Sequence, residues 1–257
     1  MKTTSQNALF AILLAMAGHV GCNQSKTEPG YVPAGRTTEG RRESVAPVTP
    51  AEERSSAGSG NVCLTIHLPK PQFTGTPKDI RSPNLEPARG GKPRPPIDVP
   101  AGADKVLSKD CKVTSSDPEP IIGELAFITD GDKEHDAATY VELGPGTQWV
   151  QVDLGKEKVI YAACVWHYHG EARVYSDVVC QISNDPDFID GVVTVFNNDH
   201  DNSSKLGEGK EKEYIETNEG RPFAVNGVKG RYVRFSSKGN TSNEMNHYTE
   251  VEVYGKP

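Results

Sequence analysis

Residues 104–257 are predicted to form an all-β domain, and three observations indicate this fold class. Wherever a period can be read there, β-branched and aromatic residues alternate with polar ones, as in half-buried strands. No window of a dozen residues shows the i, i+3, i+4 apolar stripe of a surface helix. The same part holds 15 of the chain's 18 aromatic residues, whereas 13 of its 19 prolines lie in residues 23–103. Short strands with long polar connections favour a β-sandwich or barrel.

The first residues of the chain have the proportions of an export signal. One lysine precedes an apolar run from Ala8 to Ala17, which suits a secretory signal and is shorter than the roughly 20 residues that span a bilayer. The segment ends in Gly-His-Val-Gly-Cys22 and resembles a bacterial lipoprotein signal, whose cysteine becomes the lipid-modified first residue. We expect residues 1–22 to be such a signal, with Cys22 lipidated and the protein held at the cell envelope through this lipid alone. The alternative is a plain secretory signal, with the protein secreted.

Residues 23–103 are predicted to be a disordered, Pro-rich spacer. As far as about Gly60 the segment has almost nothing to bury, so it cannot recover its ordering entropy. Residues 61–72 are more apolar and suggest one short extended stretch. The proline- and arginine-rich residues 75–100 suit a stiff spacer, and the alternative is that they wrap over the domain surface.

The strands of the domain are justified in chain order by their alternation and by the turn residues between them. Leu154-Gly155, Asn184-Asp-Pro, Asn197-Asn-Asp, Asn226-Gly and Lys238-Gly-Asn separate apolar runs that are too short for helices. Core packing is the expected role of both tryptophans, Trp149 and Trp166. The expected strands cover residues 148–154, 159–169, 174–183, 191–196, 230–236 and 249–254.

Charge and cysteine content exclude several classes of function. Residues 104–257 carry 16 basic and 27 acidic residues, and this net charge of −11 argues against a nucleic-acid-binding surface. Four cysteines follow the signal, and their spacing is not that of a zinc or haem site. Cys164 and Cys180 are the pair expected if any disulfide forms, but each can equally be a small buried apolar residue, as can Cys63 and Cys111.

Six segments occur in the order and spacing of the discoidin, or F5/8 type C, family, which the domain resembles. This resemblance implies a galactose-binding-like jelly-roll sandwich over roughly residues 104–257, in a family that includes many bacterial carbohydrate-binding modules. The segments are Cys111-Lys-Val-Thr-Ser-Ser, Ala126-Phe-Ile-Thr-Asp-Gly-Asp, Trp149-Val-Gln-Val-Asp-Leu-Gly, Val179-Cys-Gln-Ile-Ser-Asn-Asp, Gly230-Arg-Tyr-Val-Arg-Phe and Glu250-Val-Glu-Val-Tyr-Gly.

The resemblance also implies a structural Ca²⁺ in the first loop. Asp130 and Glu250 would supply carboxylates, Thr139 a hydroxyl, and Phe127 and Asp132 carbonyl oxygens. Such an oxygen set suits a hard cation with six to eight ligands. The alternative is that Asp-Gly-Asp is only a turn.

Other polar residues are candidates by type. Sugar-binding members of the family use His, Arg, Asn and aromatic residues on loops, which suggests a ligand site formed by His169, Arg173, Asn246, His247 and Tyr248. His167 and His169 would share a strand face and could serve a metal-dependent hydrolase. The loop 198–211 lacks the glycine and glutamate positions of an EF-hand, so a polar surface loop or a separate ion or ligand contact is expected.

These observations predict a non-catalytic glycan-binding module displayed outside the cytoplasm. The first alternative is a protein-interaction or structural adhesion module that binds another envelope protein, since the same sandwich serves both roles. The second alternative is a hydrolase that uses His167 and His169.

Overall fold

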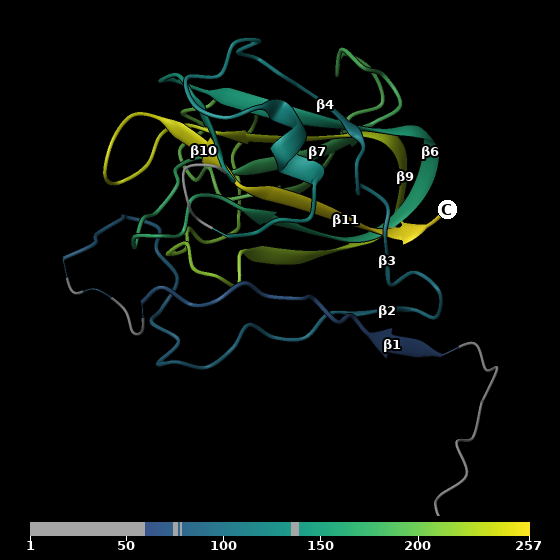
Figure 1. The fold of residues 1–257 in the computed structure, drawn as a ribbon, viewed down its shortest axis with the longest axis horizontal. Coiled ribbons are helices and arrows are strands. Elements are labelled where there is room, and N and C mark those ends of the chain that lie inside the picture. Colours follow the sequence, from purple (N-terminus) through teal and green to yellow (C-terminus); the bar gives the residue numbers. More distant parts are fainter. Residues whose placement is uncertain (1–59, 74–76, 78, 135–138) are drawn as a thin grey trace, which may run out of the picture. The chain divides into compact units, whose positions relative to one another are not determined.

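Two long strands, β6 (Gln148–Trp166) and β9 (Arg221–Ser237), pair antiparallel and set the architecture (Figure 1). Their register breaks between Asp153 and Lys158, where both strands bend, so that the two halves of the pair enter different sheets. Gly155 lies at this bend with a φ of 77°, a left-handed conformation that glycine adopts readily. The computed structural model describes residues 60–73, 77, 79–134 and 139–257, all within the compact unit Ser55–Pro257.

The bend folds one seven-stranded antiparallel sheet into the two layers of a sandwich, which we call the first and second sheets. The first sheet has the order β4-β6-β9-β7-β8 and the second the order β3-β11-β6-β9. Outside these sheets, β5 (Val141–Leu143) pairs antiparallel with β10 (Asn246–Tyr248). The 3-10 helix η1 (Leu125–Thr129) comes between β4 and β5 in the sequence. The all-β sandwich predicted from the sequence is confirmed. The remaining strands are β3 (Lys105–Val106), β4 (Lys112–Ser115), β7 (Val179–Ser183), β8 (Val193–Asn197) and β11 (Glu250–Lys256).

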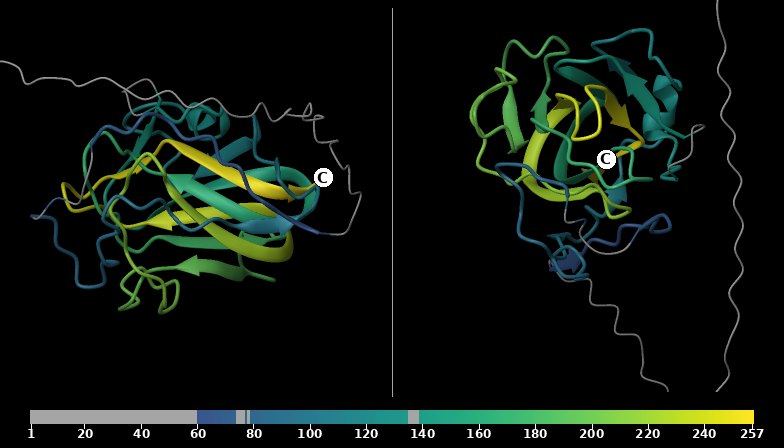
Figure 2. Two further views of the ribbon diagram at one scale, coloured as in Figure 1. Left: turned by 90° about the horizontal axis from the view of Figure 1, so that it is seen from below. Right: turned by 90° about the vertical axis from the view of Figure 1, so that its left-hand side faces the viewer.

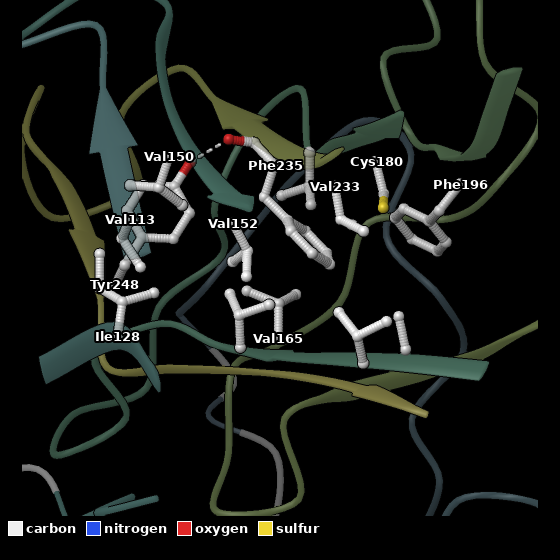
Figure 3. Close-up of a cluster of buried hydrophobic side chains, with 14 of the residues drawn as sticks. Val113, Ile128, Val150, Val152, Val165, Cys180, Phe196, Val233, Phe235 and Tyr248 are labelled. Atoms are coloured by element: carbon white, nitrogen blue, oxygen red, sulfur yellow. Dashed lines mark hydrogen bonds between the residues drawn. The ribbon is translucent and has the colours of Figure 1, made fainter. Parts of the chain in front are cut away.

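The main core fills the space between the two sheets (Figure 3). Val150 and Val152 of β6 lie in it beside Val233 and Phe235 of β9, and Val165 reaches it from the second sheet. All five side chains are 0% exposed, which is the burial that the period of two in these strands predicts.

The described residues between 60 and 103, which are 60–73, 77 and 79–103, form a strap that packs on the outer face of the second sheet (Figure 1 and Figure 2). Its ends pair as β1 (Asn61–Cys63) and β2 (Asp98–Pro100), antiparallel. Leu64, Val99 and Ala103 of the strap join a second core cluster whose members from the sandwich are Ala162, Cys164, Trp166 and Tyr254.

The domain boundary expected at residue 104 therefore needs correction, since the described part of the strap belongs to the fold and is not a spacer. The physical reason lies in β6, where Ala162, Cys164 and Trp166 face away from the main core and are each 0% exposed. Such an apolar outer face has to be covered. The alternative that this segment wraps over the domain is the one observed, while residues 1–59 lie outside the described residues.

Ion pairs and hydrogen bonds tie the strap to the sandwich. Glu86 accepts hydrogen bonds from Arg94 of the strap, at 3.3 Å, and from Arg221 of β9, at 3.2 Å. Arg89 pairs with Glu219 in the loop before β9. Because these charged groups are partly buried and interlinked, they fix the strap's register more firmly than isolated surface pairs would.

The two tryptophans have different surroundings. Trp166 is fully buried beneath the strap, as expected. Trp149 instead lies half-buried on the outer face of the first sheet, where the guanidinium of Arg234 stands 4.1 Å from its ring and 4.0 Å from the ring of Phe188. The core role expected for Trp149 is therefore wrong.

Cys63, Cys111, Cys164 and Cys180 are all free thiols. Cys164 belongs to the cluster under the strap and Cys180 to the main core, so the two lie on different sides of the second sheet. The expected pair does not form, and both residues are the buried apolar groups that the alternative described. Within the described ranges, no helix has the length and apolarity needed to cross a membrane.

Candidate functional site

The loop after η1 reaches the last strand, as the predicted calcium site requires. The backbone N–H of Gly131 donates to Oε2 of Glu250, 3.1 Å away, and so joins this loop to the start of β11. Glu250 is buried, and this burial, with the nearby Glu252 carboxylate adding to it, raises its pKa to about 9. A cation would stabilise the charged form of such a carboxylate.

The other predicted ligands make bonds within the loop. The carboxylates of Asp130 and Asp132 each accept the backbone N–H two residues further on, at 2.8 and 3.0 Å, and both residues are exposed. The Thr139 hydroxyl donates to the carbonyl of Glu134 at 2.6 Å. The carbonyl of Phe127 accepts the N–H of Asp130 at 3.5 Å. These bonds leave the carboxylates with lone pairs for an ion.

A positive charge already reaches this loop. The Lys109 ammonium donates to the carbonyl of Asp130 and, at 2.9 Å, to the carboxylate of Asp110. That hydrogen bond to Asp110, with the charges of Asp110, Asp130 and Glu250, raises the pKa of Lys109. The donor types suit a hard cation. Lys109 contacts the Asp130 carbonyl, which lies outside the predicted ligand set, and Asp130, Asp132 and Glu250 do not form a close group of three carboxylates in the described structure, so the calcium assignment stays a prediction.

Four of the five candidate glycan contacts are buried: His169, Asn246, His247 and Tyr248. The amide of Asn246 makes four hydrogen bonds to neighbouring protein groups. The ring nitrogens of His247 lie 3.0 Å from the Tyr175 hydroxyl and 3.0 Å from the Glu142 carboxylate. Their expected place at a ligand surface is therefore wrong, because the protein itself uses their polar atoms.

Arg173 keeps a partly exposed side chain. Its guanidinium donates to Glu171 at 3.0 Å and lies 4.7 Å from the ring of Tyr168. It is therefore the one residue of the predicted set that a ligand could reach without displacing the core.

His167 and His169 belong to the interior. Nδ1 of His167 lies 2.9 Å from Oε2 of Glu216, both side chains are fully buried, and the His167 ring stacks on Tyr175 at 4.3 Å. His169 Nε2 lies 2.8 Å from the carbonyl of Lys133. Neither histidine lines any of the four main hollows, and neither joins a group of three potential metal ligands in the described chain. The hydrolase alternative thus finds no accessible site in these two residues.

One hollow of about 310 Å³, the strap cleft, lies between the strap and the loop before β9. Apolar groups including Leu68, Phe73 and Ile215 line it. Polar groups at its walls include Arg89, Lys92, Asn218 and Glu219. The cleft therefore combines an aromatic ring with hydrogen-bonding side chains, which is the usual build of a small-molecule site.

A second hollow of about 320 Å³, the loop groove, lies between strap residues 81–83 and loops at one end of the sandwich. Its lining is mainly charged and polar and includes Asp177, Asp201, Glu213 and Lys238. The sequence identified only the 198–211 loop of this set. Asp177 and Glu213 are not part of any local pattern, and the topology alone brings them to that loop.

No protein-family model matches the chain, and no curated protein matches it. Similar solved structures include the CBM32 of AlyQ in complex with 4,5-unsaturated mannuronic acid, with 21% identity, 56% of this chain and 95% of that chain covered, and a TM-score of 0.42. A chitosan-binding module from Paenibacillus sp. IK-5 is 21% identical, with 58% of this chain and 98% of that chain covered and a TM-score of 0.43. A pectin-binding carbohydrate-binding module is 20% identical, with 57% of this chain and 91% of that chain covered and a TM-score of 0.41. These modules are what the chain is similar to in fold.

Proposed function

We propose that this protein is a non-catalytic glycan-binding module whose ligand lies in the strap cleft. The observation that carries the proposal is that the aromatic ring of Phe73 and polar groups of opposite charge line one cleft of about 310 Å³. A sugar ring offers a face of C–H groups and a rim of hydroxyls. The apolar side chains suit the first, and the side chains of Asn218, Arg89 and Glu219 suit the second.

The carboxylates in this cleft favour binding without catalysis. Glycoside hydrolysis uses a pair of carboxyl groups that are free to give and take protons. Glu86 and Glu219 both line the cleft, but Glu86 is bonded to Arg94 and Arg221, and Glu219 to Arg89. Carboxylates held in this way orient arginines and ligand hydroxyls.

The test is a binding screen with matched variants. Oligosaccharides of chitosan, pectin and mannuronate are offered to the wild type, to Phe73→Ala and to Phe188→Ala by isothermal titration. Phe188 is the control, because it is also half-buried but lies on the outer face of the first sheet beside Arg234. We expect Phe73→Ala to weaken binding about tenfold or more, as truncation of a contact aromatic does, and Phe188→Ala to leave it unchanged.

Three results would contradict the proposal. Binding that is equal in all three proteins would move the site out of the strap cleft. No binding to any glycan at millimolar concentration would remove the function and favour the alternative of a protein-interaction module. Release of reducing ends from a bound glycan would show catalysis.

We propose further that the module is held at the envelope by a lipid on Cys22, a residue outside the described range. Labelling with a radioactive fatty acid is expected to mark the wild type and not Cys22→Ser. A single acyl chain gives only marginal retention, so the several chains of a bacterial lipoprotein are needed for a stable anchor. Equal labelling of both proteins would exclude this anchor and indicate a secreted protein.

A further inference from the structure

Three carboxylates meet at the loop groove, two of them in its lining and the third, Asp199, directly beside these two. Asp177 precedes β7, and Asp199 and Asp201 follow β8; their ligand atoms all lie within 4.8 Å of one another. Asp177 and Asp199 are buried and Asp201 is exposed. Because β7 and β8 are paired neighbours, the loops at their ends are held side by side.

A fourth carboxylate faces the same hollow, and one of its two oxygens has no hydrogen-bond partner among the described residues. Glu213 is 5% exposed, and its Oε2 has no hydrogen-bond partner in the described structure. Glu213 lines the loop groove together with Asp177 and Asp201, although it comes from the chain before β9. A buried charged oxygen without a partner is costly, so its presence beside other carboxylates points to a missing positive group.

Positive protein groups near this cluster are fewer than the carboxylates. The Lys238 ammonium lies 3.9 Å from Oδ2 of Asp177 and donates to the carbonyl of Ser203 at 3.0 Å. Arg81 and His200 line the hollow as well. Among the described residues, one lysine, one arginine and one histidine thus face four carboxylates.

We propose that the loop groove binds a divalent cation of the Ca²⁺ class through Asp177, Asp199 and Asp201, with Glu213 completing the site directly or through water. Ca²⁺ takes six to eight oxygen ligands in irregular geometry, which a cluster of carboxylates, hydroxyls and water can supply. Mg²⁺ demands a stricter octahedron and is expected to bind less well. The proposal involves neither the strap cleft nor Glu250, so it stands whether or not the protein binds glycan.

The loop is already shaped for the ion by its own hydrogen bonds. The Asp199 carboxylate accepts the backbone N–H of Ser203 at Oδ1, at 3.0 Å, and both the N–H, at 2.9 Å, and the hydroxyl of Ser204 at Oδ2. Oδ1 therefore keeps a lone pair for an ion, whereas Oδ2 already accepts two hydrogen bonds. Substitution of Asp199 would therefore disturb the loop with or without a cation. Asp201 is exposed and Glu213→Gln preserves shape, so these two positions give cleaner tests.

The experiment is a calcium titration of the chain from residue 23 onward, after dialysis against EDTA, by isothermal calorimetry. The variants are Asp201→Asn, Glu213→Gln and Glu250→Gln, with Asp187→Asn as the control, since Asp187 is an exposed acid in the loop between β7 and β8. Melting in EDTA shows that each variant folds. Mg²⁺ replaces Ca²⁺ in a parallel titration.

We expect Asp201→Asn to weaken one class of Ca²⁺ site about tenfold or more, and Glu213→Gln to weaken the same class, because affinity follows the number of ligand charges. Asp187→Asn and Glu250→Gln are expected to retain this class unchanged. The proposal is overturned if the wild type takes up no Ca²⁺ at millimolar concentration. It is also overturned if the double variant Asp201→Asn/Glu213→Gln binds as many equivalents, as tightly, as the wild type, or if only Glu250→Gln reduces the uptake.

Discussion

Replacement of Leu64 by alanine tests whether the strap is part of the cooperative core. Leu64 is 7% exposed and belongs to the cluster that covers Cys164 and Trp166. Its backbone N–H donates to the carbonyl of Ile97 at 2.8 Å, a bond that the substitution leaves in place. The change therefore removes buried methyl groups and little else.

The expected loss follows from this burial. Truncation of a buried leucine to alanine costs about 2–5 kcal/mol, because transfer free energy is lost and a cavity remains. Leu64 lies near the end of β1 at the margin of its cluster, so we expect the lower part of this range, about 2–3 kcal/mol. For a unit of this size, that corresponds to a fall in melting temperature of roughly 4–12 °C.

Urea unfolding followed by tryptophan fluorescence measures this loss. Trp166 lies under the strap and Trp149 on the outer face of the first sheet, so the two tryptophans sample both sides of the sandwich. Val62→Ala is the matched control, since Val62 lies in β1 two residues before Leu64 but is 38% exposed, and its loss should stay within about 0.5 kcal/mol.

Equal stability of Leu64→Ala, Val62→Ala and the wild type would refute this reasoning and restore the strap to the role of a spacer. A separate early transition in Leu64→Ala, followed by an unchanged main one, would also refute it. That result would show a strap that docks as an independent unit.

Three further predictions concern single residues. Burial, and then the charges of Arg173 and His167, lower the pKa of His247 to about 4. Between pH 6.5 and 4 the unfolded chain therefore binds a proton at this residue that the folded chain does not, so the free energy of unfolding should fall as the pH drops through this range. Urea unfolding of His247→Gln should show a weaker dependence of stability on pH. Gly220→Ala should cost more than about 1 kcal/mol in the same assay, since the φ is 58° and an added Cβ would lie 2.7 Å from a carbonyl oxygen of β6. If the η1 loop holds Ca²⁺, EDTA should lower the melting temperature by several degrees, and Glu250→Gln should lose that part of the response.

The sequence predicts the sandwich because most strands carry their own evidence. In β6, Val150 and Val152 alternate with polar Gln151, and the structure buries both valines completely. The same alternation gives a phase that places Trp149 on the face opposite Val150. The outward position of Trp149 could thus be predicted, provided that strand phase is weighed above the general tendency of tryptophan to be buried.

The strap also leaves a signal in the sequence. Residues 162–166 are apolar on both faces of the strand. Ala163 and Val165 face the main core, while Ala162, Cys164 and Trp166 face outward. A strand that is apolar on both faces needs cover on both sides. Composition alone could not identify the cover, because a segment rich in proline and arginine reads as disordered until a partner surface for it is known.

The candidate sites were the least predictable feature for a different reason. The loop groove combines Asp177, Asp201 and Glu213, which come from three segments that only the topology brings together. No local spacing encodes such a set. Conversely, the neighbours Asn246 and His247 looked like ligand contacts by residue type, yet their side chains hold the loops of the sandwich together. Residue type predicts hydrogen bonding but not whether the partner is a ligand or the protein itself.

The strap cleft exists only while the strap is docked, and this links ligand binding to folding. Its walls include Phe73 and Arg89 from the strap and Asn218 from the sandwich. A ligand that binds only this assembled cleft stabilises docking by RT ln(1 + [L]/Kd), and a strap that is partly undocked lowers the apparent affinity by the same coupling. Leu64 does not line the cleft, yet its loss should weaken ligand binding wherever it loosens the strap. The apolar outer face of β6 thus has two consequences, because it requires a cover and that cover forms one wall of the proposed site.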